Sequence, residues 1–250
     1  MTLSQTIDVK NLSVSYSGKT AVRDVSFSLE SGKLIGIIGP NGAGKSTLIK
    51  GMLGLEKRDS GEVSIFGQEL DSVRKEIAYI PQRADIDWDF PILVHNAVLL
   101  GRYPRLGLLK RPSAKDKEIA MEALEKVGMA EFAKNQIGQL SGGQQQRVFM
   151  ARSLAQEADI FFLDEPFVGV DVQSEEIIIN ILRELRDQGK TIFVIHHDLT
   201  KLDEYFDDII LINKKLYGAG PVEDVVTPDL MEAAFKAPLT VLEDTGGQLS

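Results

Sequence analysis

Short apolar runs recur along the chain and predict buried strands. They are rich in β-branched residues and are bounded by turn residues, as expected when both faces of a strand are covered. The runs lie at Leu34–Ile38, Glu76–Ile80, Ile160–Leu163, Thr191–Ile195 and Ile209–Ile212.

A second pattern near the start of the chain predicts antiparallel strands. Apolar and polar residues alternate over Thr6–Tyr16 and Ala21–Leu29, with a Ser17-Gly18-Lys19 turn between them. Alternation of this kind leaves one face of a sheet solvated. Glu62–Phe66, bracketed by glycines, predicts a further short strand of the same sheet.

Helical spacing of apolar residues predicts that Ile92–Ala155 is a mostly helical insertion. Within it, the basic stretch Gly101–Pro112 is typical of a solvated loop. Because helices alternate with the buried strands elsewhere, the expected fold is a mostly parallel, three-layer α/β sheet. The individual helices are expected at Ser46–Leu53, Lys115–Val127, Gln145–Ala155, Gln173–Gln188 and Pro221–Lys236.

Composition narrows the functional classes. The 250 residues carry a net charge of −9, which argues against a nucleic-acid binder that relies on a basic surface. The absence of cysteine excludes disulfides and thiolate metal sites. No apolar run approaches the ~18 residues of a membrane span, and the first ten residues do not resemble a secretory signal. Any association with a membrane is therefore expected to come through a partner.

A glycine-rich loop between a predicted strand and a predicted helix is the strongest chemical signal. Gly39–Ser46 fits the phosphate-loop pattern GxxxxGK[ST], in which backbone N–H groups surround a phosphate at a helix N-terminus. Lys45 is expected to reach the β- and γ-phosphates, and the Ser46 hydroxyl to bind Mg²⁺. The candidate nucleotide-binding residues here are Gly39, Pro40, Asn41, Gly42, Ala43, Gly44, Lys45, Ser46 and Thr47.

Polar residues directly after buried strands give further candidates, because α/β sheets bind ligands at the carboxyl ends of their strands. Asp164 can hold Mg²⁺, and Glu165 can polarise a water molecule. His196 and His197 follow another strand. With His95 as the one other histidine and no cysteine, a phosphate contact is favoured over a transition-metal site.

Two further candidate sites each have two interpretations. Tyr16 could stack on a base or pack on its own sheet. The second glycine-rich helix start, Leu140-Ser141-Gly142-Gly143-Gln144, could bind an anion, or Ser141 could cap the helix.

Taken together, these motifs resemble the ATP-binding subunit of ATP-binding cassette (ABC) transporters over nearly the whole chain. Gly39–Ser46 resembles Walker A, Leu140–Gln144 the family signature, and Ile160–Asp164 Walker B. Five single residues complete the set. Tyr16 resembles the aromatic that stacks on the base, Gln82 the Q-loop glutamine and Glu165 the catalytic glutamate. Asp171 resembles the last residue of the D-loop, and His197 the switch histidine.

The resemblance implies a P-loop ATPase with ATP and Mg²⁺ as cofactors. It implies one ABC ATPase domain over 1–250, with the core and an antiparallel β subdomain in 1–84 and 156–250 and a helical subdomain over about 85–155. Catalysis would use Lys45, Gln82, Glu165 and His197. Mg²⁺ would be held by Ser46, Gln82 and Asp164.

The resemblance also implies partners. Two copies would pair head to tail, with Ser141, Gly142, Gly143, Gln144 and Asp171 reaching the nucleotide across the dimer. The subunit would sit on the cytoplasmic face of the membrane, held there by an integral membrane permease. An extracytoplasmic metal-binding protein would be an indirect partner.

Several segments resemble the branch that imports manganese, zinc or iron, with manganese expected first and zinc second. Leu93 departs from that branch's usual Phe-Pro-x-Thr-Val, where threonine stands at this position. The segments are Pro81–Arg83, Asp87–Pro91, Gly101–Tyr103 and His196–Asp198.

The stretch Gln82–Val94 is expected to dock on the permease through Trp88 and Phe90, the alternative being that both aromatics pack inside the helical subdomain. Rival functions are a non-transport ABC ATPase in DNA repair or translation, an inactive scaffold, a subunit for another substrate, and export instead of import.

Overall fold

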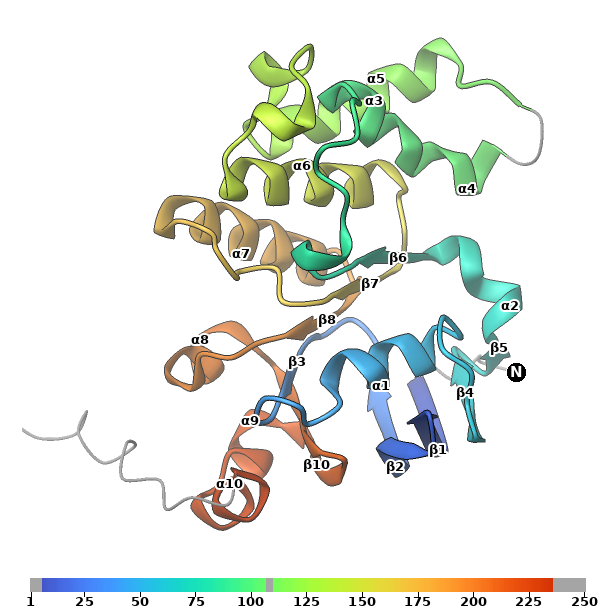
Figure 1. Ribbon diagram of the computed structural model, residues 1–250, viewed down its shortest axis with the longest axis vertical. Helices are drawn as coiled ribbons and strands as arrows, with labels where there is room; N and C mark the ends of the chain where they lie inside the picture. Colours follow the sequence, from blue (N-terminus) through green and yellow to red (C-terminus); the bar gives the residue numbers. More distant parts are fainter. Residues whose placement is uncertain (1–5, 107–109, 236–250) are drawn as a thin grey trace, which may run out of the picture.

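A twisted mixed sheet forms the centre of the molecule (Figure 1). The computed structural model describes residues 6–106 and 110–235, and in this part of the chain the larger sheet has the order β10-β9-β3-β8-β7-β6. Neighbouring strands from β9 to β6 are parallel, and β10 pairs antiparallel with β9 at the edge. The strands are β3 (Leu34–Ile38), β6 (Ile77–Ile80), β7 (Ile160–Leu163), β8 (Thr191–Ile195), β9 (Asp208–Asn213) and β10 (Lys215–Pro221).

A smaller antiparallel sheet lies beside it. Its order is β2-β1-β4-β5, and Tyr16 pairs with Lys19 across the expected hairpin. Its strands are β1 (Thr6–Tyr16), β2 (Lys19–Glu30), β4 (Ser60–Ile65) and β5 (Gln68–Glu69). Alternation predicted β1 and β2, and the bracketing glycines predicted β4, whereas the two-residue β5 is too short to leave a periodic signal.

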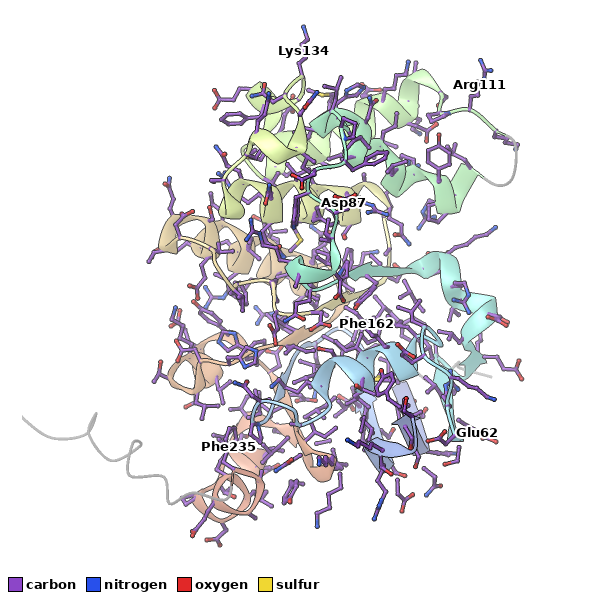
Figure 2. All side chains as sticks on the ribbon, viewed as in Figure 1. Glu62, Asp87, Arg111, Lys134, Phe162 and Phe235 are labelled. Atoms are coloured by element: carbon purple, nitrogen blue, oxygen red, sulfur yellow. The ribbon has the colours of Figure 1, made fainter. Side chains whose placement is uncertain are left out.

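The central strands separate two hydrophobic cores, which explains their unbroken apolar sequences. In β3, Leu34 and Ile38 pack into the core against the helices, while Ile35 and Ile37 pack into the core shared with the antiparallel sheet and α1 (Lys45–Met52). The side chain of Phe162 lies near the middle of the molecule (Figure 2), where its ring stacks on Phe193 with centroids 4.7 Å apart. Side chains that alternate between two buried faces require apolar residues at every position.

A layer of helices follows β6 in the chain and returns to β7, as the helical insertion was expected to do. It lies at the top of Figure 1 and packs through α6 against α3, α5 and α7. Its α-helices are α3 (Val94–Leu99), α4 (Tyr103–Leu106), α5 (Ala114–Lys126) and α6 (Gly142–Ala155), and α7 (Val172–Asp187) follows β7.

The expectation of a solvated loop at Gly101–Pro112 is wrong for its first residues. Gly101 packs so closely that a Cβ atom would lie 2.1 Å from the Arg152 carbonyl oxygen. Arg102 is buried and donates to Asp116 at 3.0 Å and to Glu157 at 2.6 Å. Residues 107–109 lie outside the described part of the chain. A local charge pattern could not reveal these acceptors, because they come from α5 and from the turn that follows α6.

The single helix expected at Pro221–Lys236 is also wrong. Pro221 ends β10, and two short helices follow, α9 (Val222–Val225) and α10 (Pro228–Phe235). Lys236 lies outside the described residues. Strand β10 was missed because Gly218 and Gly220 interrupt its apolar pattern. The short helices α2 (Leu70–Val73) and α8 (Leu202–Tyr205) were not expected either.

The described residues contain no helix with the length and apolar character needed to cross a membrane.

Replacing Arg102 with alanine should destabilise the fold, because the buried Asp116 and the Ala155 carbonyl oxygen would lose their charged donor. Charge-assisted hydrogen bonds contribute about 1.5–3 kcal/mol, which corresponds to a fall in melting temperature of about 3–12 °C. Arg74→Ala is the matched control, since its ion pair with Asp71 is exposed and should shift the melting temperature by about 1 °C or less. Equal shifts for the two variants in a thermal melt would contradict the structural role of Arg102.

Candidate functional site

The carboxyl ends of four neighbouring strands bring the candidate residues to one edge of the sheet. The parallel register aligns Ile37 with Ile195, Leu163 with Val194, and Ile80 with Leu163. Each strand then continues directly into a candidate segment, so that residues up to about 160 positions apart in sequence become neighbours. The segments are Gly39–Thr47 after β3, His196–His197 after β8, Asp164–Glu165 after β7 and Gln82 after β6.

The glycine-rich loop needs glycine at two positions for clear steric reasons. A Cβ atom on Gly39 would lie 1.9 Å from the Ile212 carbonyl oxygen, and one on Gly44 would lie 2.6 Å from the Ala21 carbonyl oxygen. Gly44 also has a left-handed φ of 92°. At the tip, Asn41 and Gly42 are exposed, while Ala43 is buried and its N–H donates to the Pro40 carbonyl oxygen at 3.1 Å. Thr47 is half-buried in α1. The loop is therefore held tightly against the sheet while its tip stays open.

Lys45 begins α1 with a buried ammonium group. Its Nζ donates to the carbonyl oxygens of Gly39 at 2.8 Å and Pro40 at 3.2 Å. Burial lowers the pKa of Lys45, and the nearby carboxylates of Glu165 and Asp164 oppose that effect. The ammonium lies within the loop that would surround a phosphate, with neutral carbonyls as its direct acceptors.

Asp164 is almost fully buried and keeps one oxygen without a partner. Its Oδ1 accepts a hydrogen bond from the Ser46 hydroxyl at 2.9 Å, whereas Oδ2 has no hydrogen-bond partner in the structure. Burial raises the pKa of Asp164, and the Ser46 bond opposes this effect. A hydroxyl beside a buried, half-satisfied carboxylate is a donor set that fits Mg²⁺, a cation that prefers oxygen ligands.

Glu165 lies between two other candidate residues. Its Oε2 accepts from the Gln82 amide at 2.5 Å, and its Oε1 lies 2.6 Å from Nε2 of His197. The backbone of Glu165 has a left-handed φ of 56°, which is costly for a residue with a side chain and is typical of functional sites. The three residues follow the ends of β6, β7 and β8, and their side chains form one hydrogen-bonded cluster.

The second glycine-rich helix start forms a helix cap within the chain. Ser141 accepts from the Gln144 N–H at 3.3 Å, and the Gln144 side chain accepts from the Ser141 N–H at 2.9 Å. Asp171 likewise caps α7 by accepting a hydrogen bond from the Ser174 N–H. A Cβ atom on Gly143 would lie 2.5 Å from Oδ2 of Asp171. A Cβ on Gly142 would approach the Gly169 carbonyl oxygen to 3.0 Å. The signature residues and Asp171 therefore pack on one another. Tyr16 lies at the end of β1 with 41 % of its surface exposed.

Sequence reasoning missed two contacts that join this edge of the sheet to its surroundings. Lys50 of α1 pairs with Asp85 at 3.1 Å, and Arg83 donates to the Gln145 side chain of α6 at 2.9 Å. Both Arg83 and Asp85 lie in the short 3₁₀ turn that follows Gln82. Their position next to Gln82 was the one signal available in the sequence.

Asp164→Asn should stabilise the protein in the absence of nucleotide. Because folding raises the pKa of this carboxyl group, the charged form at pH 7 costs stability, and the cost declines as the pH falls through the raised pKa toward the ordinary 3.8. Relief of a poorly satisfied buried charge should raise the melting temperature at pH 7 by about 2–8 °C. Asp89→Asn, on an exposed loop, is the control, and a lower melting temperature for Asp164→Asn would contradict the argument.

Comparison with known proteins places this geometry in a family. Residues 22–168, more than half of the chain, match the family model described as "ABC transporter". The chain is 53% identical over 237 residues to the manganese transport system ATP-binding protein MntB of Halalkalibacterium halodurans, covering 95% of this chain and 94% of that protein. It is 55% identical to the protein of the same name from Listeria innocua, covering 92% and 95% of the two chains. It is 46% identical to the zinc transport system ATP-binding protein TroB of Treponema pallidum, covering 92% and 86%.

Solved structures agree. The fold matches a putative metal-chelate type ABC transporter in an inward-facing conformation with a TM-score of 0.82, 26% identity and coverage of 93% and 90%. It matches the ADP conformation of an ATP-binding cassette with a TM-score of 0.75, 26% identity and coverage of 90% and 96%. The expected fold, a mostly parallel core sheet with an antiparallel sheet and a helical layer, is confirmed. The chain belongs to the ABC transporter family, as an ATP-binding subunit with the ABC ATPase domain.

Proposed function

We propose that this protein is the ATP-hydrolysing subunit of an importer of divalent metal ions, with manganese as the cargo. The observation that carries the enzymatic part is the Glu165 carboxylate held between the Gln82 amide and the His197 imidazole, at the strand edge that also carries the phosphate loop. The relatives named for manganese transport, at 53–55% identity, favour manganese over zinc, for which the named relative is 46% identical.

Nucleotide binding would use the loop and its flanking residues. The Lys45 ammonium would exchange the Gly39 and Pro40 carbonyls for oxygens of the β- and γ-phosphates, which are stronger acceptors. Tyr16, exposed at the end of β1, offers a free aromatic face for the base. The loop N–H groups from Gly39 to Thr47 would surround the phosphates at the N-terminus of α1.

Magnesium would be held by the Ser46 hydroxyl and by Asp164, with Gln82 as a third oxygen ligand. The unpartnered Oδ2 of Asp164 supports this assignment, because a cation would satisfy an atom that the fold leaves without a partner. The bound ion would neutralise phosphate charge that develops during the reaction.

The hydrolytic step would depend on Glu165 and His197. Glu165 would accept a hydrogen bond from the attacking water and take its proton as the water oxygen approaches the γ-phosphorus. His197 would donate to a γ-phosphate oxygen and stabilise its charge. The bond between the γ-phosphorus and the β–γ bridging oxygen breaks, and ADP and inorganic phosphate leave.

The signature residues would act in a second copy of the chain. Ser141, Gly142, Gly143 and Gln144 cap and pack within α6, and Asp171 caps α7 beside them, so this surface is built independently of its own phosphate loop. A head-to-tail homodimer would bring the positive N-terminus of α6 to the γ-phosphate bound in the partner.

Docking to the integral membrane permease would use an apolar strip on the helical layer. Leu93, Leu100 and Tyr103 follow helical spacing, and 36 %, 41 % and 49 % of their surfaces are exposed, beside Phe90 at 59 %. Leu93 replaces the threonine of the metal-uptake pattern, leaves α3 without a side-chain cap and adds to this strip. The ring centroid of Trp88 instead lies 5.2 Å from that of Phe149, so we assign docking to Phe90 alone among the two aromatics of Gln82–Val94.

The rest of the proposal follows from this docking. The subunit would sit on the cytoplasmic face of the membrane, and an extracytoplasmic metal-binding protein would deliver the ion to the permease. The named metal-transport relatives match nearly their whole length, which favours transport over DNA repair or translation.

Glu165→Gln should retain ATP binding and lower the turnover number by at least about 100-fold, because the amide keeps the shape but cannot accept the proton. In sedimentation experiments with ATP, the variant should also form a dimer that is absent without nucleotide. The exposed Glu176→Gln on α7 serves as the control and should keep the parent rate. Parent-like hydrolysis by the Glu165 variant would exclude it as the base.

The double variant Phe90→Ala, Leu100→Ala should leave ATP hydrolysis by the isolated subunit within about twofold of the parent. It should lose co-sedimentation with membranes that contain the permease and fail to support growth under manganese limitation, because exposed apolar side chains are lost from the interface. Leu55→Ala changes an exposed apolar residue near the end of α1 and should retain both properties. Retained membrane binding and growth in the double variant would overturn the proposed docking strip.

A further inference from the structure

His196 lies directly before His197, yet its side chain has a separate environment. Its imidazole is 4 % exposed and is enclosed by aromatic rings. The ring of Phe167 meets it edge-on with centroids 5.4 Å apart and an angle of 88°, Phe206 lies at 5.4 Å and Tyr205 at 5.7 Å. Packing alone would be served equally well by a phenyl ring.

One ring nitrogen of this imidazole lacks a hydrogen-bond partner. Nε2 of His196 is inaccessible to solvent and has no hydrogen-bond partner in the structure. Burial lowers the pKa of His196 to about 4, so the ring is neutral at pH 7. A neutral imidazole carries one donor and one acceptor nitrogen, and buried groups of this kind are nearly always partnered. The exception therefore requires an explanation.

The wall facing His196 is the stretch Pro166–Asp171, which we call the 166–171 segment. Asp171 anchors its far end by capping α7 at 2.9 Å, whereas the residues before Asp171 are held less firmly. The segment begins after the left-handed Glu165. Its internal backbone hydrogen bonds are long, 3.3 Å from the Val168 N–H to the Glu165 carbonyl oxygen and 3.4 Å from the Val170 N–H to the Phe167 carbonyl oxygen. Bonds of this length are weaker than those near 2.9–3.0 Å. The strained start and the long internal bonds make residues 166–170 the part of the segment that can adopt a second arrangement at little cost.

A cavity of about 180 Å³ adjoins this contact and gives the segment room. His196, Phe167 and Val168 line it, together with Glu165 and His197. The one cavity thus touches the unpartnered imidazole, the 166–171 segment and the two side chains assigned to hydrolysis. A shift of the segment would change the surroundings of all three.

We propose that His196 is a positioning residue, whose Nε2 gains its hydrogen-bond partner when the 166–171 segment rearranges around a bound nucleotide. The new bond holds the segment, and with it Glu165 and His197, in the reactive arrangement. This role rests on the proposed function, in which Glu165 and His197 act at the γ-phosphate. A bond that is absent in the free protein and present in the bound one shifts the population toward the bound arrangement.

Two substitutions separate this role from simple packing. His196→Gln places an amide nitrogen near the position of Nε2 but loses the ring, whereas His196→Phe keeps the ring and removes the polar atom. We expect His196→Gln to keep kcat within about threefold of the parent. His196→Phe should lower kcat about tenfold, equivalent to about 1.4 kcal/mol, with KM for ATP changed less than about twofold. Without nucleotide, His196→Phe should melt at or above the parent temperature.

The order of the two variants decides the outcome, measured on the intact chain as ATP turnover and thermal melting. A kcat for His196→Phe equal to or above that of His196→Gln overturns the proposal, as does a loss of kcat in His196→Phe that tracks a lower melting temperature. Parent protein that does not hydrolyse ATP would refute the proposed function itself and this role with it. Parent turnover with the reversed order would refute the role of His196 alone.

Discussion

The parallel pairing of β3, β8, β7 and β6 is the constraint on which the site depends. Each strand ends at the same edge, and the register fixes which residue comes next at that edge. Gln82, Glu165 and His197 can share hydrogen bonds because Ile80 is aligned with Leu163, and Leu163 with Val194. A shift of one residue in any of these pairings would turn a site residue to the opposite face of the sheet. The two cores that cover both faces hold this register.

The same edge carries groups that cost stability when no nucleotide is bound. Asp164 has a buried oxygen without a partner, Lys45 is buried against neutral carbonyls, and Glu165 has a strained backbone. An anionic ligand with a divalent cation would satisfy the first two groups directly. Burial of the apolar strands therefore offsets the cost of holding these polar groups in place before a ligand binds. Such a cost is common where function requires preorganised charge.

The turn after Gln82 connects the site to the rest of the molecule. Asp85 in this turn pairs with Lys50 of α1, and Arg83 reaches Gln145 of α6. One short stretch thus contacts the helix that follows the phosphate loop and the helix that follows the signature residues. Because Gln82 itself bonds Glu165, a continuous set of polar contacts joins the helical layer to the carboxylate that we propose as the base.

The sequence by itself determined the buried strands, the glycine-rich loop and the chemical type of each candidate residue, because these depend on local periodicity and short-range spacing. Leu34–Ile38 had to be covered on both faces, and Gly39–Thr47 could not continue that strand. Only the tertiary structure decided the strand order, and with it the meeting of Gln82, Glu165 and His197. No local pattern records which distant strand supplies a neighbour.

The same reason explains the errors. Arg102 looked solvated because its acceptors lie in distant segments, and the glycines of β10 concealed a strand that its pairing with β9 stabilises. Ser141 left two interpretations open in the sequence, and the fold shows its hydroxyl capping α6. The unpartnered imidazole of His196 has no sequence signal, because burial by Phe167, Tyr205 and Phe206 exists only once the chain has folded.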